Sequence, residues 1–193
     1  MEHQEKPRYQ LNLEELKAKY EDADRQISSY RTEPAEKMLF KPSKTGWSAT
    51  EVCRHLIEFG KGYLHQMDQA VEHIRPTPQS DGPFRPRWRY RKMAAFFEPP
   101  YRLKVKTLPI FSPGDSQSVE QALEELSDIQ QNVLYLIERA ARDRWDLNRI
   151  RGRNPAFKML SMSLIEFLVL METHQRRHFW QIDQNFKRYE EAG

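Results

Sequence analysis

Four helix-capping pairs, each followed by an amphipathic stripe, constrain the fold of this chain more than any other feature. In a capping box, an N-cap residue such as Ser or Asn stands three positions before Glu or Gln, and both side chains accept hydrogen bonds from otherwise free backbone N–H groups. The pairs are Asn12/Glu15, Ser48/Glu51, Ser118/Gln121 and Ser163/Glu166. Apolar residues recur at helical spacing behind each pair, so capping and periodicity together predict four long helices.

These helices predict an all-α fold, a four-helix bundle. The apolar stripes extend over residues 13–30, 52–74, 119–137 and 160–186. The longest connection, residues 75–116, contains eight of the 12 prolines, and we expect it to be a long irregular crossover between the second and third helices. Residues 1–10 are polar and are expected to be mobile. Long connections of this kind permit an up-and-down bundle with an elaborated crossover.

Length and composition place the whole chain, residues 1–193, in one domain. A chain of this length buries roughly 70% of its unfolded surface, and 31% charged with 38% hydrophobic residues is typical of a soluble helical protein. The single cysteine, Cys53, excludes an internal disulfide and fits a reducing compartment. The polar start and the absence of a long apolar run argue against secretion and membrane insertion. We therefore expect a cytoplasmic protein with no membrane partner.

Two histidines, His174 and His178, lie one helical turn apart, about 6 Å along the axis of the fourth helix. They share the apolar stripe of that helix, so both imidazoles are expected to point into the core. His55 leans into the bundle from the second helix, whereas His65 lies on a flank and is expected to be exposed. His73 shares the face of His55 but is about 27 Å further along the helix, too far to share a ligand with it.

Three neutral imidazoles from two helices are the ligand set of an open divalent-metal site, because closed structural zinc sites use four ligands. The sequence therefore predicts a metal site at His55, His174 and His178. Zinc, nickel and iron all accept such ligands. The pattern alone leaves a second interpretation open, in which the three are hydrogen-bonded core histidines without a metal.

Two further residues are candidates for roles near this site. Gln181 follows His178 on the same stripe and is placed to hydrogen-bond an imidazole that binds metal, although a polar residue at the rim of the bundle is an equal interpretation. Glu58 is one turn after His55 and is the nearest acid or base by spacing, with a solvated face residue as the alternative. No Glu stands between His174 and His178 as it does in His-Glu-x-x-His zinc proteases, so peptide hydrolysis of that kind is disfavoured.

Two segments together resemble a known family. Residues 47–56 open with Trp-Ser and contain His55 followed by Leu, and residues 174–182 follow the pattern His-x-x-x-His-x-x-Gln-Ile. In this order and on these helices, the motifs resemble the DinB/YfiT-like metalloenzyme superfamily, and the resemblance covers roughly residues 12–189.

The resemblance implies a four-helix bundle in which one His of the second helix and two of the fourth hold a divalent metal. By matching position these are His55, His174 and His178. Relatives include thiol S-transferases that use bacillithiol, mycothiol or glutathione, and a mycothiol-dependent isomerase. The resemblance therefore implies a low-molecular-weight thiol as a second cofactor, activated by the metal, and a homodimer, because relatives are often dimers.

The net charge of +3 is unevenly distributed, because residues 75–106 carry nine Lys or Arg against Asp81 and Glu98. Within this region, residues 84–92 interleave cations with aromatic side chains. Such a segment can bind nucleic acid, attract an anionic substrate to the mouth of a site, or pack on the acidic bundle. We expect the last, and we expect no nucleic-acid partner.

The leading hypothesis is a metal-dependent transferase or hydrolase that acts on a small-molecule substrate, with a thiol-dependent S-transferase as its most specific form. The second hypothesis is a non-catalytic metal- or ligand-binding protein of the stress-response type. The third is a nucleic-acid-binding module that uses residues 84–92. Metal analysis is the measurement that best discriminates among these hypotheses.

Overall fold

The four long helices begin at the predicted caps. The structure is a computed structural model that describes residues 9–73, 78–98, 107–114 and 118–192. The long helices are α1 (Leu13–Tyr30), α3 (Ala49–Glu72), α5 (Val119–Arg142) and α6 (Leu164–Ala192). Complete capping boxes precede α1, α3 and α5. Before α6, the backbone N–H of Ser163 donates to Glu166 at 2.8 Å. The predicted mobile start falls mostly outside the described residues.

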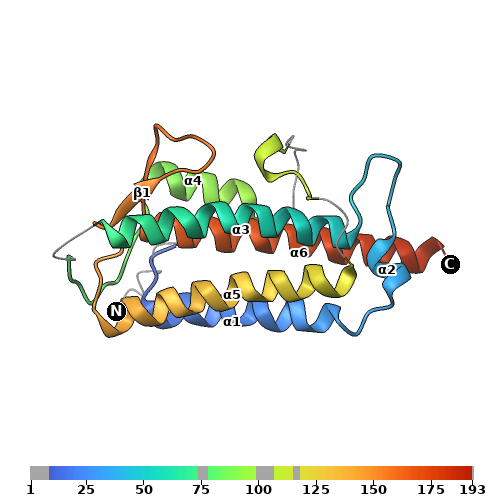
Figure 1. Ribbon diagram of the computed structural model, residues 1–193, viewed down its shortest axis with the longest axis horizontal. Coiled ribbons are helices and arrows are strands. Elements are labelled where there is room, and N and C mark those ends of the chain that lie inside the picture. Colours follow the sequence, from blue (N-terminus) through green and yellow to red (C-terminus); the bar gives the residue numbers. More distant parts are fainter. Residues whose placement is uncertain (1–8, 74–77, 99–106, 115–117, 193) are drawn as a thin grey trace, which may run out of the picture.

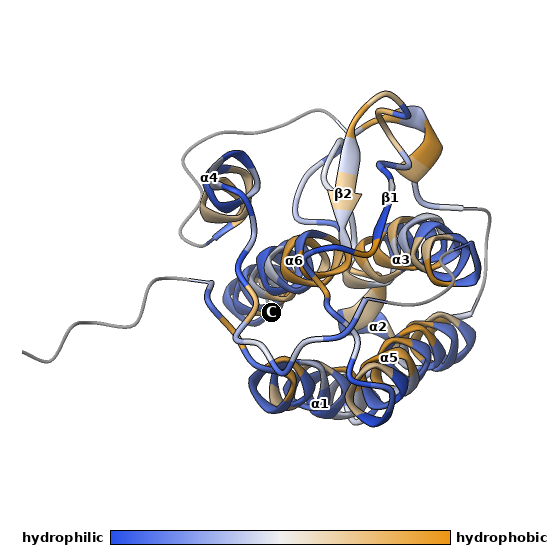
Figure 2. Ribbon diagram, turned by 90° about the vertical axis from the view of Figure 1, so that its left-hand side faces the viewer, coloured by the Kyte–Doolittle hydropathy of each residue, from blue (hydrophilic) through white to orange (hydrophobic). Residues whose placement is uncertain are grey.

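The four long helices form a bundle in which α1 and α3 lie on one diagonal (Figures 1 and 2), because α5 and α6 each pack against both of them. The predicted all-α four-helix bundle is therefore confirmed. The helices do not alternate strictly up and down, however. Lys61 of α3 pairs with Glu125 of α5, and the N–H of Ser80, after α3, donates to the carbonyl of Arg144, after α5. The two helices therefore run parallel.

The crossover from α3 to α5 is more ordered than expected. It contains the helix α4 (Trp88–Phe97) and the 3-10 turn η1 (Pro109–Phe111), and part of it lies outside the described residues. Helix α4 packs on α6. Arg87, at its N-cap, forms an ion pair with Glu166 at 2.6 Å, and the Glu166 side chain is fully buried. This buried contact, between residues 79 positions apart, gives the Pro- and Arg-rich segment a fixed place.

Two smaller elements complete the fold. The short helix α2 (Ala35–Leu39) lies between α1 and α3. Strands β1 (Arg151–Arg153) and β2 (Ser161–Ser163) form an antiparallel hairpin between α5 and α6. Gly152 is required there, because a Cβ atom would lie 2.8 Å from the backbone oxygen of Gln66 in α3. Among the described residues, no helix has the length and apolarity to cross a membrane.

The interior contains two separate apolar clusters, divided along the long axis of the bundle. One includes Phe59 of α3 and Met171 of α6, and the other includes Leu56 of α3 and Phe179 of α6. Buried polar side chains occupy the level between them. On α3 and α6 these are His55, Glu172, Thr173, His174, Gln175 and His178.

Candidate metal centre

His55 is held in the second turn of α3, directly behind the capping box that fixes the start of this helix. Its side chain is 3% exposed. The Nδ1 atom lies 2.6 Å from the backbone oxygen of Phe111 in η1. Because a carbonyl oxygen only accepts, Nδ1 carries the proton and donates it, and this leaves the lone pair on Nε2. The crossover thus sets the tautomer and orientation of His55.

His174 and His178 project from successive turns of α6, with ring centroids 4.5 Å apart, and both are buried. Nδ1 of His178 lies 3.0 Å from Oε1 of Gln181. Since this amide oxygen accepts, Nε2 of His178 keeps its lone pair. Of the two interpretations that the sequence left open for Gln181, this contact agrees with the hydrogen bond to an imidazole.

The fold brings His55, His174 and His178 together. The ring centroid of His55 lies 5.3 Å from that of His174 and 4.6 Å from that of His178. The Nε2 atoms of His55 and His174 are 3.0 Å apart, and one nitrogen from each of the three residues lies within 4.8 Å of the others. A tetrahedral zinc ion with bonds of about 2.0–2.1 Å separates its nitrogen ligands by roughly 3.3 Å. The group can therefore hold a metal ion.

The hydrogen-bonding pattern also fits a cation. His55 and His178 direct lone pairs toward the same space, while Nδ1 of His174 is buried without a hydrogen-bond partner among the described residues. A buried imidazole pair with facing lone pairs is unfavourable unless a donor or a cation lies between them. The histidines can therefore act as ligands of a cation. In the absence of a cation, Nε2 of His174 can instead donate a hydrogen bond to Nε2 of His55 across the same 3.0 Å.

Electrostatics keeps the three imidazoles neutral. Burial lowers the pKa of His55, partly opposed by its hydrogen bond to Phe111. Burial lowers the pKa of His174 well below its ordinary value, and the neighbouring His178, His55 and Arg177 lower it further. The pKa of His178 falls for the same main reason, with Gln181 acting in the opposite direction. Neutral imidazole is the form that binds metals.

Aromatic rings surround the histidines. Phe59 stacks on His174 at 4.1 Å between centroids, and Phe97, from α4, meets it edge-on at 4.9 Å. Trp47 lies 5.1 Å from His55, and its backbone oxygen accepts a hydrogen bond from Asn185. These rings pack around the histidines, and such an apolar surrounding strengthens electrostatic interactions at the site.

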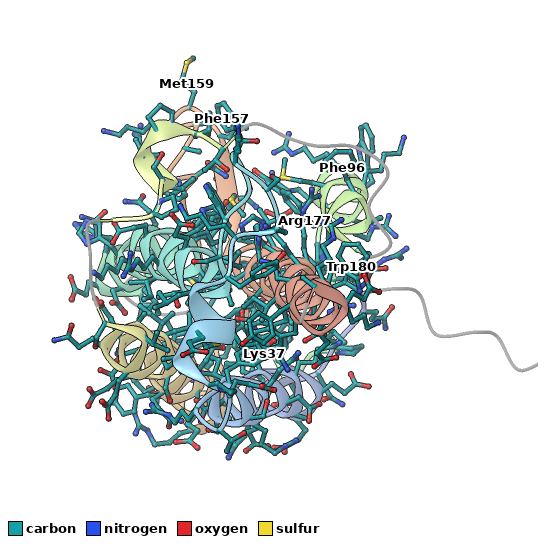
Figure 3. All side chains as sticks on the ribbon, turned by 90° about the vertical axis from the view of Figure 1, so that its right-hand side faces the viewer. Lys37, Phe96, Phe157, Met159, Arg177 and Trp180 are labelled. Carbon is teal, nitrogen blue, oxygen red and sulfur yellow. The ribbon has the colours of Figure 1, made fainter. Side chains whose placement is uncertain are left out.

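Two arginines of α6 lie beside the aromatic rings that surround the histidines. Arg177 stands over the ring of Phe97 at 6.0 Å, and it projects from α6 near Trp180 (Figure 3). Arg176 pairs with Glu172 on its own helix and with Glu98 at the end of α4. The charges tie the end of α4 to α6 next to His174.

Other residues considered from the sequence lie elsewhere. The Glu58 carboxylate lies 3.5 Å from Lys61 and is not a member of the ligand group. Glu51 caps α3 and pairs with Lys41. His65 is exposed, as expected, and so is His73, which hydrogen-bonds to its own helix. Cys53 is buried, and burial raises the pKa of its thiol to about 12.

Sequence reasoning missed two contributors, the carbonyl of Phe111 and the ring of Phe97. Both come from the crossover, 56 residues after His55 in the first case. A turn at Phe111 is signalled by Pro109 at the start of η1, but nothing in the local pattern indicates which side chain that turn meets.

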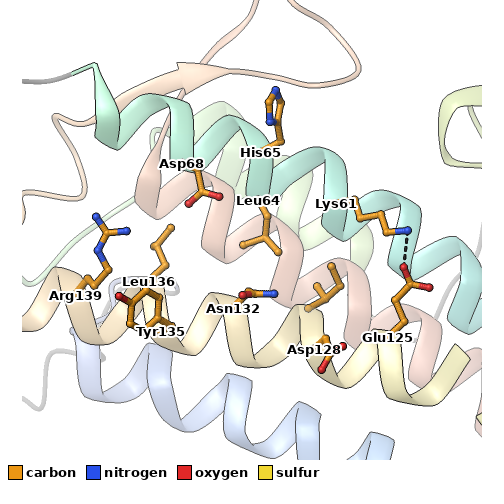
Figure 4. Close-up of a pocket in the computed structure, with 11 residues that line it drawn as sticks. Lys61, Leu64, His65, Asp68, Glu125, Asp128, Asn132, Tyr135, Leu136 and Arg139 are labelled. Atoms are coloured by element: carbon orange, nitrogen blue, oxygen red, sulfur yellow. Dashed lines mark ion pairs between the residues drawn. The ribbon is translucent and has the colours of Figure 1, made fainter. Parts of the chain in front are cut away.

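A surface groove between α3 and α5 is separate from His55, His174 and His178 (Figure 4). It has a volume of about 590 Å³ and is lined by charges of both signs, including Lys61, Asp68 and Arg139. The Lys61–Glu125 ion pair crosses one end. The groove brings together none of the candidate ligands.

Comparison with known families agrees with this geometry. A model of the DinB superfamily matches residues 12–182. The chain belongs to the DinB superfamily. The match covers both halves of the histidine site and ends just after Gln181, so the resemblance read from the two motifs is confirmed. Neither curated proteins nor solved structures give a significant match.

Proposed function

We propose that this DinB-superfamily protein holds one divalent metal ion at His55, His174 and His178 and is a metal-dependent transferase or hydrolase of small molecules. The observation that carries the proposal is the convergence of three buried, neutral imidazoles within 4.8 Å, with the Nε2 atoms of His55 and His174 only 3.0 Å apart. Three protein ligands leave a position for a water or a substrate. Zinc, nickel and iron are the candidate ions.

The ion would supply Lewis acidity, which lowers the pKa of a thiol or water at the open position. Residues of the chain would orient the ligands, exclude water and attract an anion. Phe111 and Gln181 hold the rings of His55 and His178 in the ligating tautomer. Phe59, Phe97 and Trp47 exclude bulk water. The Arg177 charge, close enough to lower the pKa of two histidines, favours an anionic substrate or cofactor.

The most specific form of the proposal is a thiol S-transferase that uses a low-molecular-weight thiol in the cytoplasm. The family resemblance supports it, and the dry, cation-flanked site is suited to a thiol that carries carboxylates. A homodimer is part of the same proposal. Glu58 is not assigned a catalytic role, because its carboxylate lies beside Lys61 and outside the ligand group.

Metal analysis of protein purified without an affinity tag tests the site. We expect near one divalent ion per chain in the wild type and in His73→Ala, whose histidine is exposed, and loss of the ion in the His174→Ala/His178→Ala double variant. A wild-type protein that is free of metal and also fails to take up zinc, nickel or iron would refute the proposal.

Thiol-transfer assays of the metal-loaded protein test the activity. Bacillithiol, mycothiol and glutathione are each offered with an electrophilic acceptor, and the double variant is the control. Turnover that requires both the metal and one of the thiols supports the S-transferase. Inactivity of a fully loaded protein with every thiol, together with absence of hydrolysis, favours the non-catalytic metal-binding protein instead.

A further inference from the structure

Two cationic segments that are distant in the chain meet on one side of the molecule. Residues 85–92 contain five Lys or Arg and residues 149–158 contain four, and neither segment contains a carboxylate. Tyr90 donates to the carbonyl oxygen of Ser161 at 3.0 Å, and Arg87 donates to the same oxygen. These contacts hold α4 against the β1–β2 hairpin and gather both sets of charge.

Exposed apolar side chains gather on the same side. Of nine large hydrophobic residues that are exposed in the described part of the chain, seven belong to α4, to η1 with the residue before it, or to the hairpin loop. Met159 is 98% exposed and Phe157 54% exposed at the loop tip, and Trp88 is 63% exposed on α4. Phe111 of η1 and Pro155 of the loop both border Gly62 of α3, so these elements adjoin.

The β1–β2 hairpin, α4 and η1 lie on one side of the molecule (Figures 1 and 3). Figure 1 shows the hairpin, α4 and η1 on the same side of the bundle, over α3 and α6 and opposite α1 and α5. Figure 3 shows Met159 and Phe157 projecting outward at this side, with Phe96 on the neighbouring α4. We refer to this surface, formed by α4, η1 and the β1–β2 loop, as the cationic apolar face.

We propose that the cationic apolar face docks on an anionic lipid surface. Peripheral membrane binding combines apolar side chains that enter the boundary of the acyl chains with Lys and Arg that remain at the level of the phosphates. The loop tip combines both kinds of residue, because Lys158 lies between Phe157 and Met159 in the sequence. Among the described residues no helix can span the bilayer, so the protein lies on the membrane rather than across it.

Charge complementarity selects an anionic partner, and the type of apolar residue selects lipid over nucleic acid. Bases are bound by stacking on aromatic rings. Trp88, Phe96 and Phe157 of this face are aromatic, but four of its seven exposed apolar side chains are not, and these include the most exposed one, Met159. Aliphatic side chains lose their contact with water in a lipid interface but gain little on a base. The proposal departs from the sequence-based expectation of no membrane partner, because the sequence did not reveal that the two cationic segments meet.

Vesicle flotation tests the proposal with the full-length protein. We expect binding to phosphatidylcholine vesicles that contain about one third phosphatidylserine, little binding to pure phosphatidylcholine, and weakening at high salt. A fluorescently labelled single-stranded oligonucleotide is offered under the same conditions as the competing partner.

Two variants separate the apolar and the ionic contribution. Phe157→Ser/Met159→Ser removes the apolar tip, and Lys92→Glu/Lys158→Glu reverses two exposed charges. Each is expected to weaken binding to the anionic vesicles about tenfold or more. The matched controls are Leu39→Ser, which is 55% exposed on α2, and Arg31→Glu, an exposed cation at the end of α1. Both controls should bind like the wild type.

The outcomes are distinguishable from failure of folding and from failure of the metal site. All five proteins are compared by circular dichroism, and metal content is measured in parallel, since no variant touches a histidine. Absence of wild-type binding to anionic vesicles overturns the proposal. So does equal weakening by the two control variants, and so does binding of the oligonucleotide in place of the vesicles.

Discussion

The Nε2 atoms of His55 and His174 lie 3.0 Å apart, although 119 positions separate the two residues. No local rule forces this distance. It requires that α3 and α6 run antiparallel at a fixed level, with Phe59 packed on His174 at 4.1 Å. The two rings are therefore pre-positioned.

Metal loading should stabilise the fold. A ligand that binds only the native state at about 100 times its Kd contributes about 2.7 kcal/mol, which corresponds to an increase in Tm of about 5–11 °C for a chain of this size. Thermal unfolding with added zinc and after treatment with EDTA measures the difference. The His174→Ala/His178→Ala protein should show no such increase; a comparable increase in that variant would point to binding elsewhere.

The metal-free protein should lose stability in mild acid. The pKa values of His55, His174 and His178 are lower in the native state than the ordinary 6.5, chiefly through burial. The unfolded chain therefore binds more protons below pH 6.5, and the free energy of unfolding decreases as the pH falls through that value. Urea denaturation between about pH 5 and 8 measures this slope. Substituting His174 by Leu should make the slope shallower, whereas an unchanged slope would contradict the assignment.

Gln181 should support metal affinity without binding the ion. Gln181→Leu removes the acceptor for Nδ1 of His178, and loss of such a partner typically weakens metal binding about 10–100-fold. Competition with a chromogenic chelator gives the dissociation constant. Gln184→Leu, three positions further along the same helix, is the control. Equal affinities in the two variants would show that Gln181 is only a rim residue.

Breaking the Arg87–Glu166 pair should destabilise the protein. Arg87→Met leaves a fully buried carboxylate without its guanidinium partner, and we expect a loss of about 2 kcal/mol, below the usual 3–5 kcal/mol because Arg87 itself is partly exposed. The exposed pair of Arg144 with Asp81 provides the comparison, and Arg144→Met should destabilise the protein less than Arg87→Met does. Urea denaturation compares them, and similar losses would mean that burial of Glu166 is unimportant.

Gly152 and Gly62 should respond oppositely to alanine. A Cβ at Gly152 would meet the Gln66 backbone oxygen at 2.8 Å, whereas at Gly62 the nearest atom is 3.5 Å away. Gly152→Ala should therefore destabilise the hairpin contact by about 1–3 kcal/mol, and Gly62→Ala, inside α3, should stabilise by up to about 1 kcal/mol. The Tm values of both variants, compared with that of the wild type, test this prediction. Stabilisation in both cases would mean that the hairpin can move away from α3 at little cost in free energy.

Local signals in the sequence predicted the four long helices and the residues that approach each other at the metal centre. Capping pairs and stripes depend only on residues within one or two turns, so they can be read directly, and the inward direction of His55, His174 and His178 follows from the same periodicity. Whether the three rings meet depends on which helices are neighbours in the bundle and on how far they are shifted relative to each other along its axis. The motif resemblance supplied that information, not periodicity.

Long-range contacts explain what remained unpredicted. The parallel arrangement of α3 and α5 depends on the course of the crossover, and α4 has its place because Arg87 meets Glu166. The sequence predicted only a capping role for Glu166. It identified residues 84–92 as a basic segment with several possible partners. Their positions are determined by partners about 80 residues away, which no local pattern specifies.

The division of the interior into two apolar clusters has a consequence for cooperativity. In most small bundles, one continuous hydrophobic core couples both ends of every helix. Here, on α3 and α6, buried polar side chains that include His55 and His174 lie at the boundary between the two clusters. An ion bound there would cross-link α3 and α6 at the boundary between the two apolar clusters. The same three side chains would then contribute both to the chemistry of the protein and to the cooperativity of its folding.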